Sequence, residues 1–458
     1  MDTIFSISSS LSLFLFPSLT KSLLPSINKI LPFLSSDLAL LRTNIGEIPN
    51  DWIVDKLGDK AYIKARIGWR GLSSDEYTDE GPYLVAGKHI KGSKILWDEC
   101  DHISIERYNE SSEIMLKEKD IIMTKDGTIG RVGFIDKLND KATINGTMML
   151  IRPDEELFYS KFLYYYFQGE NFKKVINEKV SGSSIPHIFQ RDMVNLEVPI
   201  PHKYEQEKII LILSTLDEQI DITDALIEKN KRLKKGLMKT LLTKGIGNIR
   251  FRKTDIGEIP EEWDYGKLSN YVELKHGYQF RKEDFIDCGI PIIKISQISM
   301  NGKLELKELT YISNSRENDF KDIIIKNGDI LLALSGATVG KVALVKDLNG
   351  VYLQNYRVGK LICNNNLVNE YVFHYINSEI FYKQLMKLTN TSAQPNFGKQ
   401  DMDKILITIP PKKEQQKIAS ILSKVDEKID MYENKKQRLE KLKRGLIQQL
   451  LTGSIRVI

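Results

Sequence analysis

The chain has little of what disulfide frameworks, metal centres and membrane anchors are built from. It contains three cysteines and six histidines in 458 residues, and neither type is grouped at the spacing of a metal site. Scattered cysteines provide no disulfide framework, so a reducing cytoplasm is the expected compartment. The apolar run of residues 11–16 ends at Pro17 and is far too short to span a bilayer, so no membrane partner is expected.

Complete catalytic motifs are also lacking. Residues 336–342 (GATVGKV) resemble a phosphate-binding loop, but one residue is missing between the glycines and a valine replaces the magnesium-binding Ser or Thr. Residues 409–412 (IPPK) lack the polar residue and the aromatic of an amino-methyltransferase motif. No Glu-x-Lys closely follows Pro153-Asp154, as a nuclease motif would require. We therefore expect a chain that binds and positions, with no catalytic residue, metal or cofactor of its own.

The composition is that of a soluble globular protein. Hydrophobic residues make up 41% of the chain and charged residues 28%, and the length suits about three domains. The net charge of +5 and the pI of about 8.7 are mildly basic. Such a balance permits a nucleic-acid partner but does not require one.

One long segment of the sequence occurs twice in the chain. The stretch that begins PHKYEQEKIILILSTLDEQID at Pro201 returns as PPKKEQQKIASILSKVDEKID at Pro410. Glu205 corresponds to Glu414 and Gly236 to Gly445, in each case 209 residues later (414 − 205 and 445 − 236). A fixed offset of this kind identifies an internal repeat, so the rest of the chain is expected to be organised around the two copies.

Each copy predicts one long helix, Glu205–Leu242 and Glu414–Leu451. Proline precedes each helix, a glutamate lies in the first turn, and apolar residues recur at intervals of three and four. This spacing predicts a coiled-coil seam between the two copies, formed by Ile209, Leu213, Leu216, Ile220, Ile418, Leu422, Val425 and Ile429. The alternative is that each stripe is covered by its own domain. Because glycine is costly inside a helix, we expect Gly236 and Gly445 at a close approach to the other helix or domain.

The repeat extends beyond the helix. IGEIPNDWIVDKLGD at Ile45 returns as IGEIPEEWDYGKLSN at Ile256, and residues 120–135 and 329–345 share a pattern typical of a β-hairpin. Aromatic segments at residues 162–167 and 371–376 are expected to be helical and buried. The bodies between these blocks differ, which suggests one task performed on two targets. Drifting surface loops are the alternative.

The differing bodies carry basic, amide and aromatic groups beside glycines. Arg and Lys can read guanine and Gln can read adenine, while other cations contact phosphates. The candidate DNA-binding residues are Lys64, Arg66, Trp69, Arg70, Lys125, Arg131, Lys275, His276, Tyr278, Gln279, Arg281 and Lys341.

Together, these motifs resemble the specificity subunit of Type I restriction–modification systems. The resemblance rests on two copies of IGEIP…W, two variable bodies with DI…G-T-x-G-[KR]-V, and two helices that open near E-Q-x-K-I and close on LLT-G-I. It covers the chain from about Arg42 onward. It implies an α+β fold in which two mixed α/β target-recognition domains are separated by two long antiparallel coiled-coil helices with pseudo-two-fold symmetry.

The resemblance also implies a function and partners. Each recognition domain would read one half of a split, asymmetric site in double-stranded DNA. The partners would be two modification subunits that use S-adenosylmethionine, and restriction subunits that use ATP and Mg²⁺. The alternatives are a methyltransferase or nuclease with unrecognised motifs and a coiled-coil scaffold that binds only proteins.

The repeat predicts five segments. Residues 1–41 form an N-terminal extension outside the family pattern, for which a start site set too far upstream is one explanation. Residues 42–200 form recognition domain 1, residues 201–246 the central helix, residues 247–409 the linker and domain 2, and residues 410–458 the C-terminal helix. A helix of about 38 residues is roughly 57 Å long, which predicts half-sites about 10 base pairs apart.

Overall fold

The computed structural model describes residues 34–35, 39–65, 72–180, 187–389 and 396–457. Two compact units are present: unit 1 is Met1–Asp224 with Asn434–Ile458, and unit 2 is Ala225–Glu433. Both boundaries fall inside a long helix, so each unit contains half of each helix. The five predicted segments instead treat each long helix as a segment of its own, and their boundaries stay predictions.

Unit 1 is a mixed α/β body of short strands and short helices, as predicted from its sequence. Its strands are β1 (Leu34–Ser35), β2 (Leu40–Thr43), β3 (Gly46–Pro49), β4 (Ile53–Lys56), β5 (Ala61–Ala65), β6 (Tyr77–Val85), β7 (Ile90–Lys91), β8 (Lys94–Ile95), β9 (Asp101–Ile103), β10 (Ile121–Thr124), β11 (Val132–Phe134), β12 (Ala142–Ile144), β13 (Met148–Pro153), β14 (Glu197–Ile200) and β26 (Arg456–Val457). Its shorter α-helices are α3 (Ile105–Asn109), α4 (Ser160–Tyr166), α5 (Glu170–Val180) and α6 (Gln190–Val194).

Unit 2 repeats much of this order. Its strands are β15 (Phe251–Thr254), β16 (Gly257–Pro260), β17 (Asp264–Lys267), β18 (Val272–His276), β19 (Ile290–Ile293), β20 (Thr310–Ile312), β21 (Ile330–Ala333), β22 (Val342–Leu344), β23 (Leu353–Gln354), β24 (Val358–Cys363) and β25 (Leu406–Ile409). Its shorter α-helices are α8 (Asn369–Ile376), α9 (Glu379–Thr389) and α10 (Lys399–Met402).

Each unit contains its own four-stranded antiparallel sheet, and the two sheets have equivalent strand orders. The strand order is β11-β10-β13-β5 in unit 1 and β22-β21-β24-β18 in unit 2. The predicted hairpins are confirmed: β10 pairs with β11 and β21 pairs with β22. The glycines of the hairpin-forming turns have positive φ, +70° at Gly127 and +74° at Gly336. The sequence at 336–342 therefore forms a strand-to-strand turn.

The predicted aromatic helices are α4 and α8, and both are buried. Tyr164 and Tyr165 of α4 are 2% and 0% exposed, and Tyr371 and Tyr375 of α8 are 0% exposed. They belong to the main apolar core of their own unit, together with residues of the shared sheet. Their aromatic rings therefore stabilise the fold.

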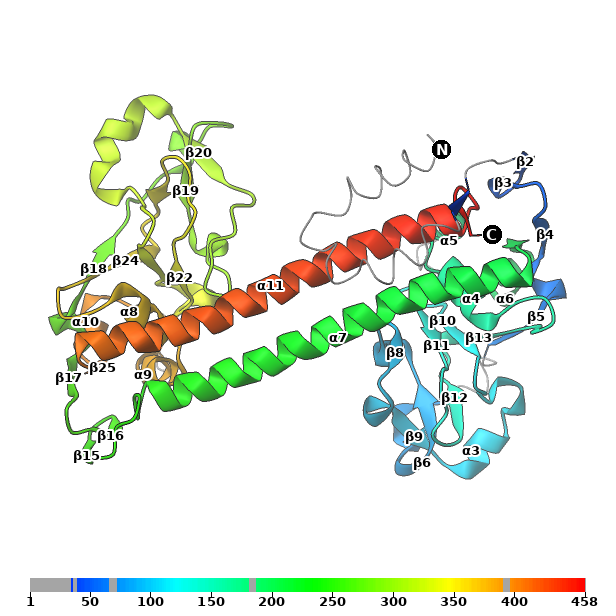
Figure 1. Cartoon of the computed structure of the whole chain (residues 1–458), viewed down its shortest axis with the longest axis horizontal. Helices are drawn as coiled ribbons and strands as arrows, with labels where there is room; N and C mark the ends of the chain where they lie inside the picture. The colour runs from blue at the N-terminus through cyan, green and yellow to red at the C-terminus, as the bar shows by residue number, and fades with distance from the viewer. Residues whose placement is uncertain (1–33, 36–38, 66–71, 181–186, 390–395, 458) are drawn as a thin grey trace. The chain divides into compact units, whose positions relative to one another are not determined.

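The two long helices are α7 (Lys203–Leu241) and α11 (Lys412–Leu450), of 39 residues each. Each agrees with its predicted range to within two residues. In unit 1, Lys443 Nζ lies 2.6 Å from Asp217 Oδ1 and Lys436 Nζ lies 2.7 Å from Asp224 Oδ1. As the residue number increases along α7, the residue number of its partner in α11 decreases, so the two helices are antiparallel in unit 1 (Figure 1).

Unit 2 shows the same antiparallel arrangement. Lys234 Nζ lies 2.6 Å from Asp426 Oδ1, and Lys231 Nζ lies 3.2 Å from Glu433 Oε1. The repeated sequence therefore folds as predicted: an α+β protein with two mixed α/β bodies and two long antiparallel helices.

The apolar stripe of each long helix packs partly against the other long helix and partly against the core of a unit. Leu216 and Ile220 of α7 pack against Leu439 and Leu442 of α11. Ile209 and Leu213 instead enter the main core of unit 1, which also contains Leu450 of α11. In unit 2, Ile418 and Leu422 enter its main core beside Met238 and Leu241 of α7. Val425 is half-buried and Ile429 is buried. Helical periodicity identifies an apolar face but cannot tell which partner covers it.

The expectation for Gly236 and Gly445 is wrong. Both are exposed, and in the described part of the chain no atom lies within 4 Å of where a Cβ would be at either position. The apolar stripe occupies another face of each helix, so these glycines face solvent.

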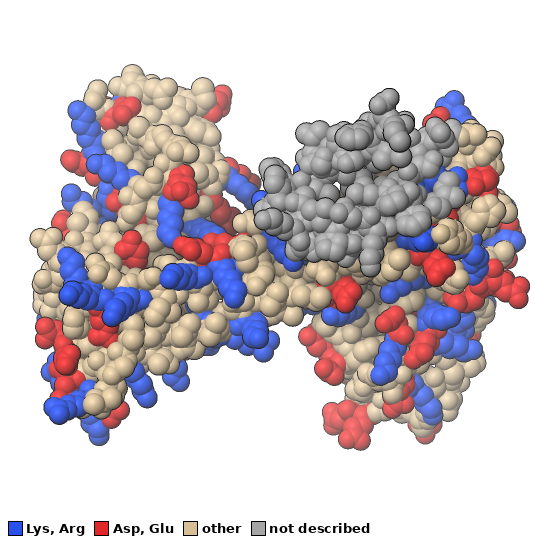
Figure 2. Space-filling model, in the orientation of Figure 1, with Lys and Arg blue, Asp and Glu red and all other residues tan. Residues whose placement is uncertain are grey.

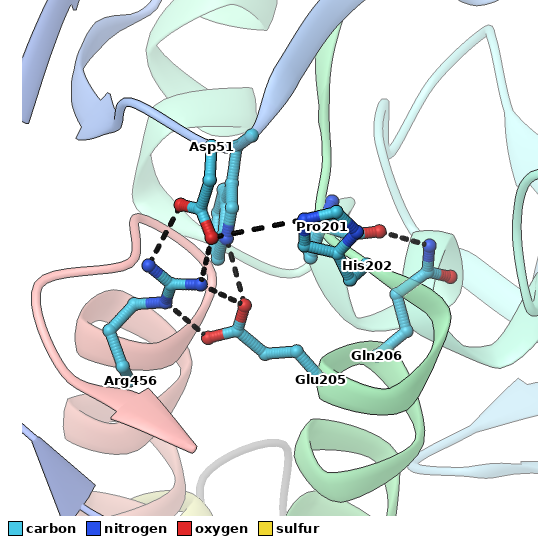
Figure 3. Close-up of polar contacts among 7 residues, drawn as sticks. Asp51, Pro201, His202, Glu205, Gln206 and Arg456 are labelled. Carbon is cyan, nitrogen blue, oxygen red and sulfur yellow. Dashed lines mark hydrogen bonds and ion pairs between the residues drawn. The ribbon is translucent and has the colours of Figure 1, made fainter. Parts of the chain in front are cut away.

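The start of α7 is held by a buried polar junction (Figure 3). Glu205, only 3% exposed, accepts a hydrogen bond from Trp52 Nε1 at 2.9 Å. Arg456 donates to both Glu205 oxygens, from Nε at 2.6 Å and from Nη2 at 2.8 Å. It also donates to both Asp51 oxygens, at 2.9 and 2.8 Å. The C-terminal strand and the IGEIP…W motif are thereby fixed to the same turn of α7.

Residues near the N-terminus contribute to this end of unit 1. Leu34 and Ser35 pair with Val457 and Arg456 as an antiparallel strand. Strands β2 and β3 form a hairpin that matches β15 and β16 in unit 2. Of the segment assigned to an extension, residues 34–35 and 39–41 therefore join strands or turns of unit 1. The remainder lies outside the described residues.

Candidate nucleic-acid interface

Three segments of unit 2 meet beside its four-stranded sheet. Leu334 N donates to Arg357 O at 2.9 Å, and Phe397 N donates to Leu334 O at 2.8 Å. Ser335 and Asn396 form an isolated β-bridge. These bonds join the turn after β21, the turn before β24 and the segment that leads into α10. We call residues 334–335, 355–357 and 396–401 the unit 2 rim.

The unit 2 rim surrounds a hollow of about 600 Å³, which is also lined by His276 at the end of β18. The side chains of Arg357, Lys399 and Gln400 are exposed around it. Arg357 lies with its guanidinium 5.3 Å from the ring centroid of Tyr356. Cationic and amide groups beside an accessible hollow are suited to phosphate and base-edge contacts.

Unit 1 has the same backbone arrangement. Lys125 N donates to Thr147 O at 2.9 Å, and Ile188 N donates to Lys125 O at 3.0 Å. Asp126 and His187 form an isolated β-bridge. We call residues 125–126, 145–147 and 187–192 the unit 1 rim. The shared hairpin and the shared segment before α6 or α10 are what bring these residues together.

The side chains of the unit 1 rim contact one another. Lys125 Nζ lies 3.0 Å from Asp126 Oδ2, and the His187 ring nitrogen Nδ1 lies against the other Asp126 oxygen. The Phe189 ring lies 4.3 Å from that of His187, and the Arg191 guanidinium lies 4.7 Å from the Phe189 centroid. Phe189 is nevertheless 48% exposed. An exposed ring under a cation is able to stack on a base or a sugar.

The candidate residues of unit 1 are partly placed by the structure. Lys64 is half-buried on β5, with its Nζ 5.6 Å from the Tyr62 centroid. Lys125 belongs to the rim, and Arg131 donates from Nη1 to Gly87 O at 2.9 Å. Arg66, Trp69 and Arg70 lie outside the described residues.

In unit 2, Lys275 and His276 are exposed at the end of β18, and Gln279 and Arg281 are exposed in the segment that follows. Tyr278 is 46% exposed and packs against Phe320 with centroids 4.9 Å apart. Lys341 is half-buried after the hairpin turn. His276 is therefore the candidate that the structure places directly at the unit 2 hollow.

Sequence reasoning missed most of the rim residues. Arg357, Asn396 and Gln400 in unit 2, and His187 and Arg191 in unit 1, lie in or beside the repeated blocks, not in the inserts. A position-by-position comparison of the two copies of each block would have revealed that these side chains differ.

Both signs of charge are present on each unit. Figure 2 shows Lys and Arg side chains interspersed with Asp and Glu side chains on the face that it displays. Binding by either unit would thus depend on local groups rather than on a uniform basic surface.

Comparison with known families decides what these duplicated bodies are. The sequence model described as "Type I restriction modification DNA specificity domain" matches the chain twice, at residues 49–232 and 260–441. The chain belongs to this family. Each specificity-domain match takes in one recognition body and most of the long helix that follows it.

Relatives in the specificity-domain family match most of the chain. The Type I restriction enzyme MjaVIII specificity subunit of Methanocaldococcus jannaschii is 30% identical over 427 residues, covering 90% of this chain and 94% of the relative. The EcoBI specificity subunit of Escherichia coli is 22% identical and covers 74% of this chain and 73% of the relative. A crystal structure of the Type I restriction–modification S subunit of M. genitalium matches with a TM-score of 0.57 at 17% identity, over 89% of this chain and 99% of that one.

The described residues contain neither a membrane-spanning helix nor a metal-binding cluster. No helix among them is long and apolar enough to cross a membrane. Within the same ranges, no group of three or more His, Cys, Asp or Glu side chains is arranged to hold a metal ion. Cys100 is buried, and burial raises the pKa of its thiol to about 12.

Proposed function

We propose that this chain is the DNA-specificity subunit of a cytoplasmic Type I restriction–modification complex. Unit 1 and unit 2 each read one half of a split, asymmetric site in double-stranded DNA, and the chain itself catalyses no reaction. The observation that carries the proposal is one backbone scaffold used twice with different exposed side chains, in a chain of the specificity-domain family.

The partners follow from the same proposal. Two modification subunits carry S-adenosylmethionine and methylate the DNA, and restriction subunits carry ATP and Mg²⁺. The names of the relatives, which are specificity subunits of Type I restriction enzymes, support this division of labour. No metal or cofactor is assigned to this chain.

The test is to assemble the chain with its modification subunits and to select bound sequences from randomised duplex DNA. The expected result is a two-part sequence with an unread spacer, and methylation of sites that carry it. The isolated chain, supplied with S-adenosylmethionine or Mg²⁺ and DNA, should show no turnover; turnover would favour a methyltransferase or nuclease. Failure of the assembled complex to select any sequence would favour a scaffold that binds only proteins.

We propose further that the long helices set the spacing of the half-sites. Each helix has 39 residues, roughly 58 Å at 1.5 Å per residue. One heptad inserted between Asp224 and Ala225, and another between Glu433 and Asn434, would leave the ion pairs within each unit intact. The selected half-sites should then move apart by about 3 base pairs while keeping their own sequences. Selection of the original spacing would show that the helices are not the ruler.

A further inference from the structure

The two rims share a backbone arrangement but carry different exposed side chains, and this points to where each unit reads DNA. Resting on the proposed function, we infer that rim side chains distinguish the bases of each half-site. In unit 2, Arg357 reads a guanine, and the amides of Asn396 and Gln400 are placed to read adenine. In unit 1 the equivalent positions are occupied by Thr147, His187 and Arg191.

The backbone of the rim is the same in both units. The bonds Lys125 N to Thr147 O and Ile188 N to Lys125 O recur as Leu334 N to Arg357 O and Phe397 N to Leu334 O. Their lengths agree to within 0.2 Å, at 2.9 and 3.0 Å against 2.9 and 2.8 Å. The rim is thus a fixed frame on which side chains are held in matching places.

Side chains that build this frame are identical in the two copies. Asn145 Oδ1 accepts a bond from Thr147 N at 3.1 Å, and Asn355 Oδ1 accepts one from Arg357 N at 3.3 Å. Asp192 and Asp401 each accept a bond at 3.0 Å from the backbone N–H three residues earlier. Residues that shape the backbone have therefore been kept through the duplication.

Five exposed or half-buried positions on the frame, other than the asparagine and aspartate that shape it, carry different residues in the two units. The pairs of unit 1 and unit 2 residues are Asp126 and Ser335, Thr147 and Arg357, His187 and Asn396, Phe189 and Gly398, and Arg191 and Gln400. A constant frame with variable polar groups is what two readers of different sequences require. Drift of surface residues predicts instead that exchanging these groups has no effect on the DNA selected.

The chemistry of the unit 2 rim favours particular bases. The planar guanidinium of Arg357 matches the O6 and N7 acceptors of guanine, and carboxamides match the N6 and N7 groups of adenine. Arg357, Asn396 and Gln400 have no side-chain hydrogen-bond partner in the described ranges, so their polar groups are available. In unit 1, by contrast, His187, Asp126 and Lys125 are already bonded to one another.

The experiment uses the assembled complex and randomised duplex DNA, and compares base frequencies at each selected position. Arg357→Thr introduces the residue of unit 1, so its backbone fit is already demonstrated within the chain. We expect discrimination to fall by about tenfold to a hundredfold at one position of one half-site, as loss of a bidentate base contact does. Arg191→Gln, which introduces into unit 1 the residue that unit 2 carries at the equivalent position 400, should affect only the other half-site.

Lys307→Thr is the matched control, because Lys307 is an exposed cation of unit 2 outside the rim. It should leave both half-sites unchanged. If the unaltered complex selects a split site but Arg357→Thr selects the same one, the rim assignment is wrong and the proposed function stands. A loss of affinity that is uniform across sequences would make Arg357 a phosphate contact and overturn its reading role. If the unaltered complex selects no sequence, the proposed function itself fails. Thermal unfolding of each variant verifies that it is folded.

Discussion

The two units hold the start of their long helix with the same glutamate but with different donors. In unit 1, Glu205 binds the indole of Trp52 and the guanidinium of Arg456. In unit 2, Glu414 binds the indole of Trp263 at 2.9 Å, the backbone N–H of Ile246 at 2.8 Å and the side-chain amide of Asn248 at 2.9 Å. The charged guanidinium of Arg456 in unit 1 thus takes the place of the neutral donors of Ile246 and Asn248 in unit 2.

Chain connectivity accounts for this difference. In unit 2 the loop from the end of α7 to Trp263 is continuous, so its own backbone reaches Glu414. In unit 1 the equivalent path is split between the C-terminal segment with Arg456 and the N-terminal segment with Asp51 and Trp52. Arg456 joins the two segments, being bonded to both Asp51 and Glu205. Hydrogen bonds from Arg456 lower the pKa of Asp51, as expected of a carboxylate held by a cation.

A second pair of equivalent sites lies where each recognition body meets the long helices. In unit 1, Tyr165 donates its hydroxyl to Asp217 at 2.9 Å, and Asp217 also binds Lys443. In unit 2 the equivalent residues are His374, Asp426 and Lys234 (374 − 165, 426 − 217 and 443 − 234 all equal 209). His374 bonds to Ser423 Oγ at 3.1 Å, and its Nδ1 lies 4.0 Å from Asp426. The same aromatic position therefore carries a phenol in unit 1 and an imidazole in unit 2.

The largest effect is expected from removing the ionic donor. Arg456→Ala leaves the carboxylate of Glu205 buried without its cation, which should cost about 3–5 kcal/mol in the free energy of unfolding of unit 1. Asn248→Ala, its counterpart in unit 2, removes one neutral bond and should cost about 1 kcal/mol. Denaturant unfolding followed by tryptophan fluorescence measures both.

The double variant Arg456→Met with Glu205→Gln is the control for the buried charge. Because it removes both charges, it should recover a large part of the stability lost in Arg456→Ala. Equal losses in Arg456→Ala and Asn248→Ala would show that the two junctions do not differ in the way described.

An intermediate effect is expected at the glycine that closes each junction. Gly453 and Gly245 have φ of +69° and +68°. A Cβ would lie 2.3 Å from Pro49 Cδ at Gly453 and 2.2 Å from Glu414 Oε1 at Gly245. Substitution by alanine therefore combines backbone strain with overlap, and each variant should lose about 2 kcal/mol. A loss at only one of them, in the same unfolding assay, would argue against equivalent junctions.

A smaller effect should depend on pH and on the residue at position 374. Burial, with Lys234 and Lys346 nearby, lowers the pKa of His374 to about 3. Above pH 6.5 the ring is neutral in both folded and unfolded chains. Below it the unfolded chain gains a proton that the folded chain does not, so stability falls as the pH approaches 3. Between pH 7.5 and 5.5 this group should remove about 1 kcal/mol.

His374→Tyr, which copies Tyr165, should abolish that part of the pH dependence. The quantity to compare is the change in unfolding free energy between the two pH values, because the larger ring alters packing at both. His202→Tyr is the control, since His202 is exposed. An unchanged pH profile in His374→Tyr would show that His374 is not the titrating group.

Local pattern was sufficient for much of the fold. The apolar spacing after Pro201 and Pro410 gave α7 and α11 to within two residues, because helical periodicity and the flanking prolines are features of the local sequence. Glycines between an apolar run and a β-branched run indicated the hairpin turns, and Gly127 and Gly336 have the positive φ that glycine adopts readily. The antiparallel direction followed from the resemblance to a family and not from periodicity.

Contacts between distant segments could not be predicted in this way. Nothing local indicates that Arg456 meets Asp51, 405 residues away, or that Asn396 bridges Ser335. Each rim forms where a hairpin turn and a pre-helical segment converge, and neither segment alone carries a pattern that indicates a binding surface. The DNA-binding roles of all the candidate residues stay predictions, and Arg66, Trp69 and Arg70 also lie outside the described residues.

The smallest effect is expected at the two helical glycines that were expected to be packed and are exposed instead. Gly236 and Gly445 lie five residues before the ends of α7 and α11, with open space around both. Alanine at either position should stabilise the isolated chain by about 0.5–1 kcal/mol, because it lowers the entropy of the unfolded chain and meets no obstacle. Thermal unfolding of the two variants measures this gain, and a loss in either would contradict the open surroundings. The same variants in the assembled complex sharpen the comparison: should alanine stabilise the chain yet weaken its assembly with the modification subunits, the repeated glycine marks a close approach of a partner.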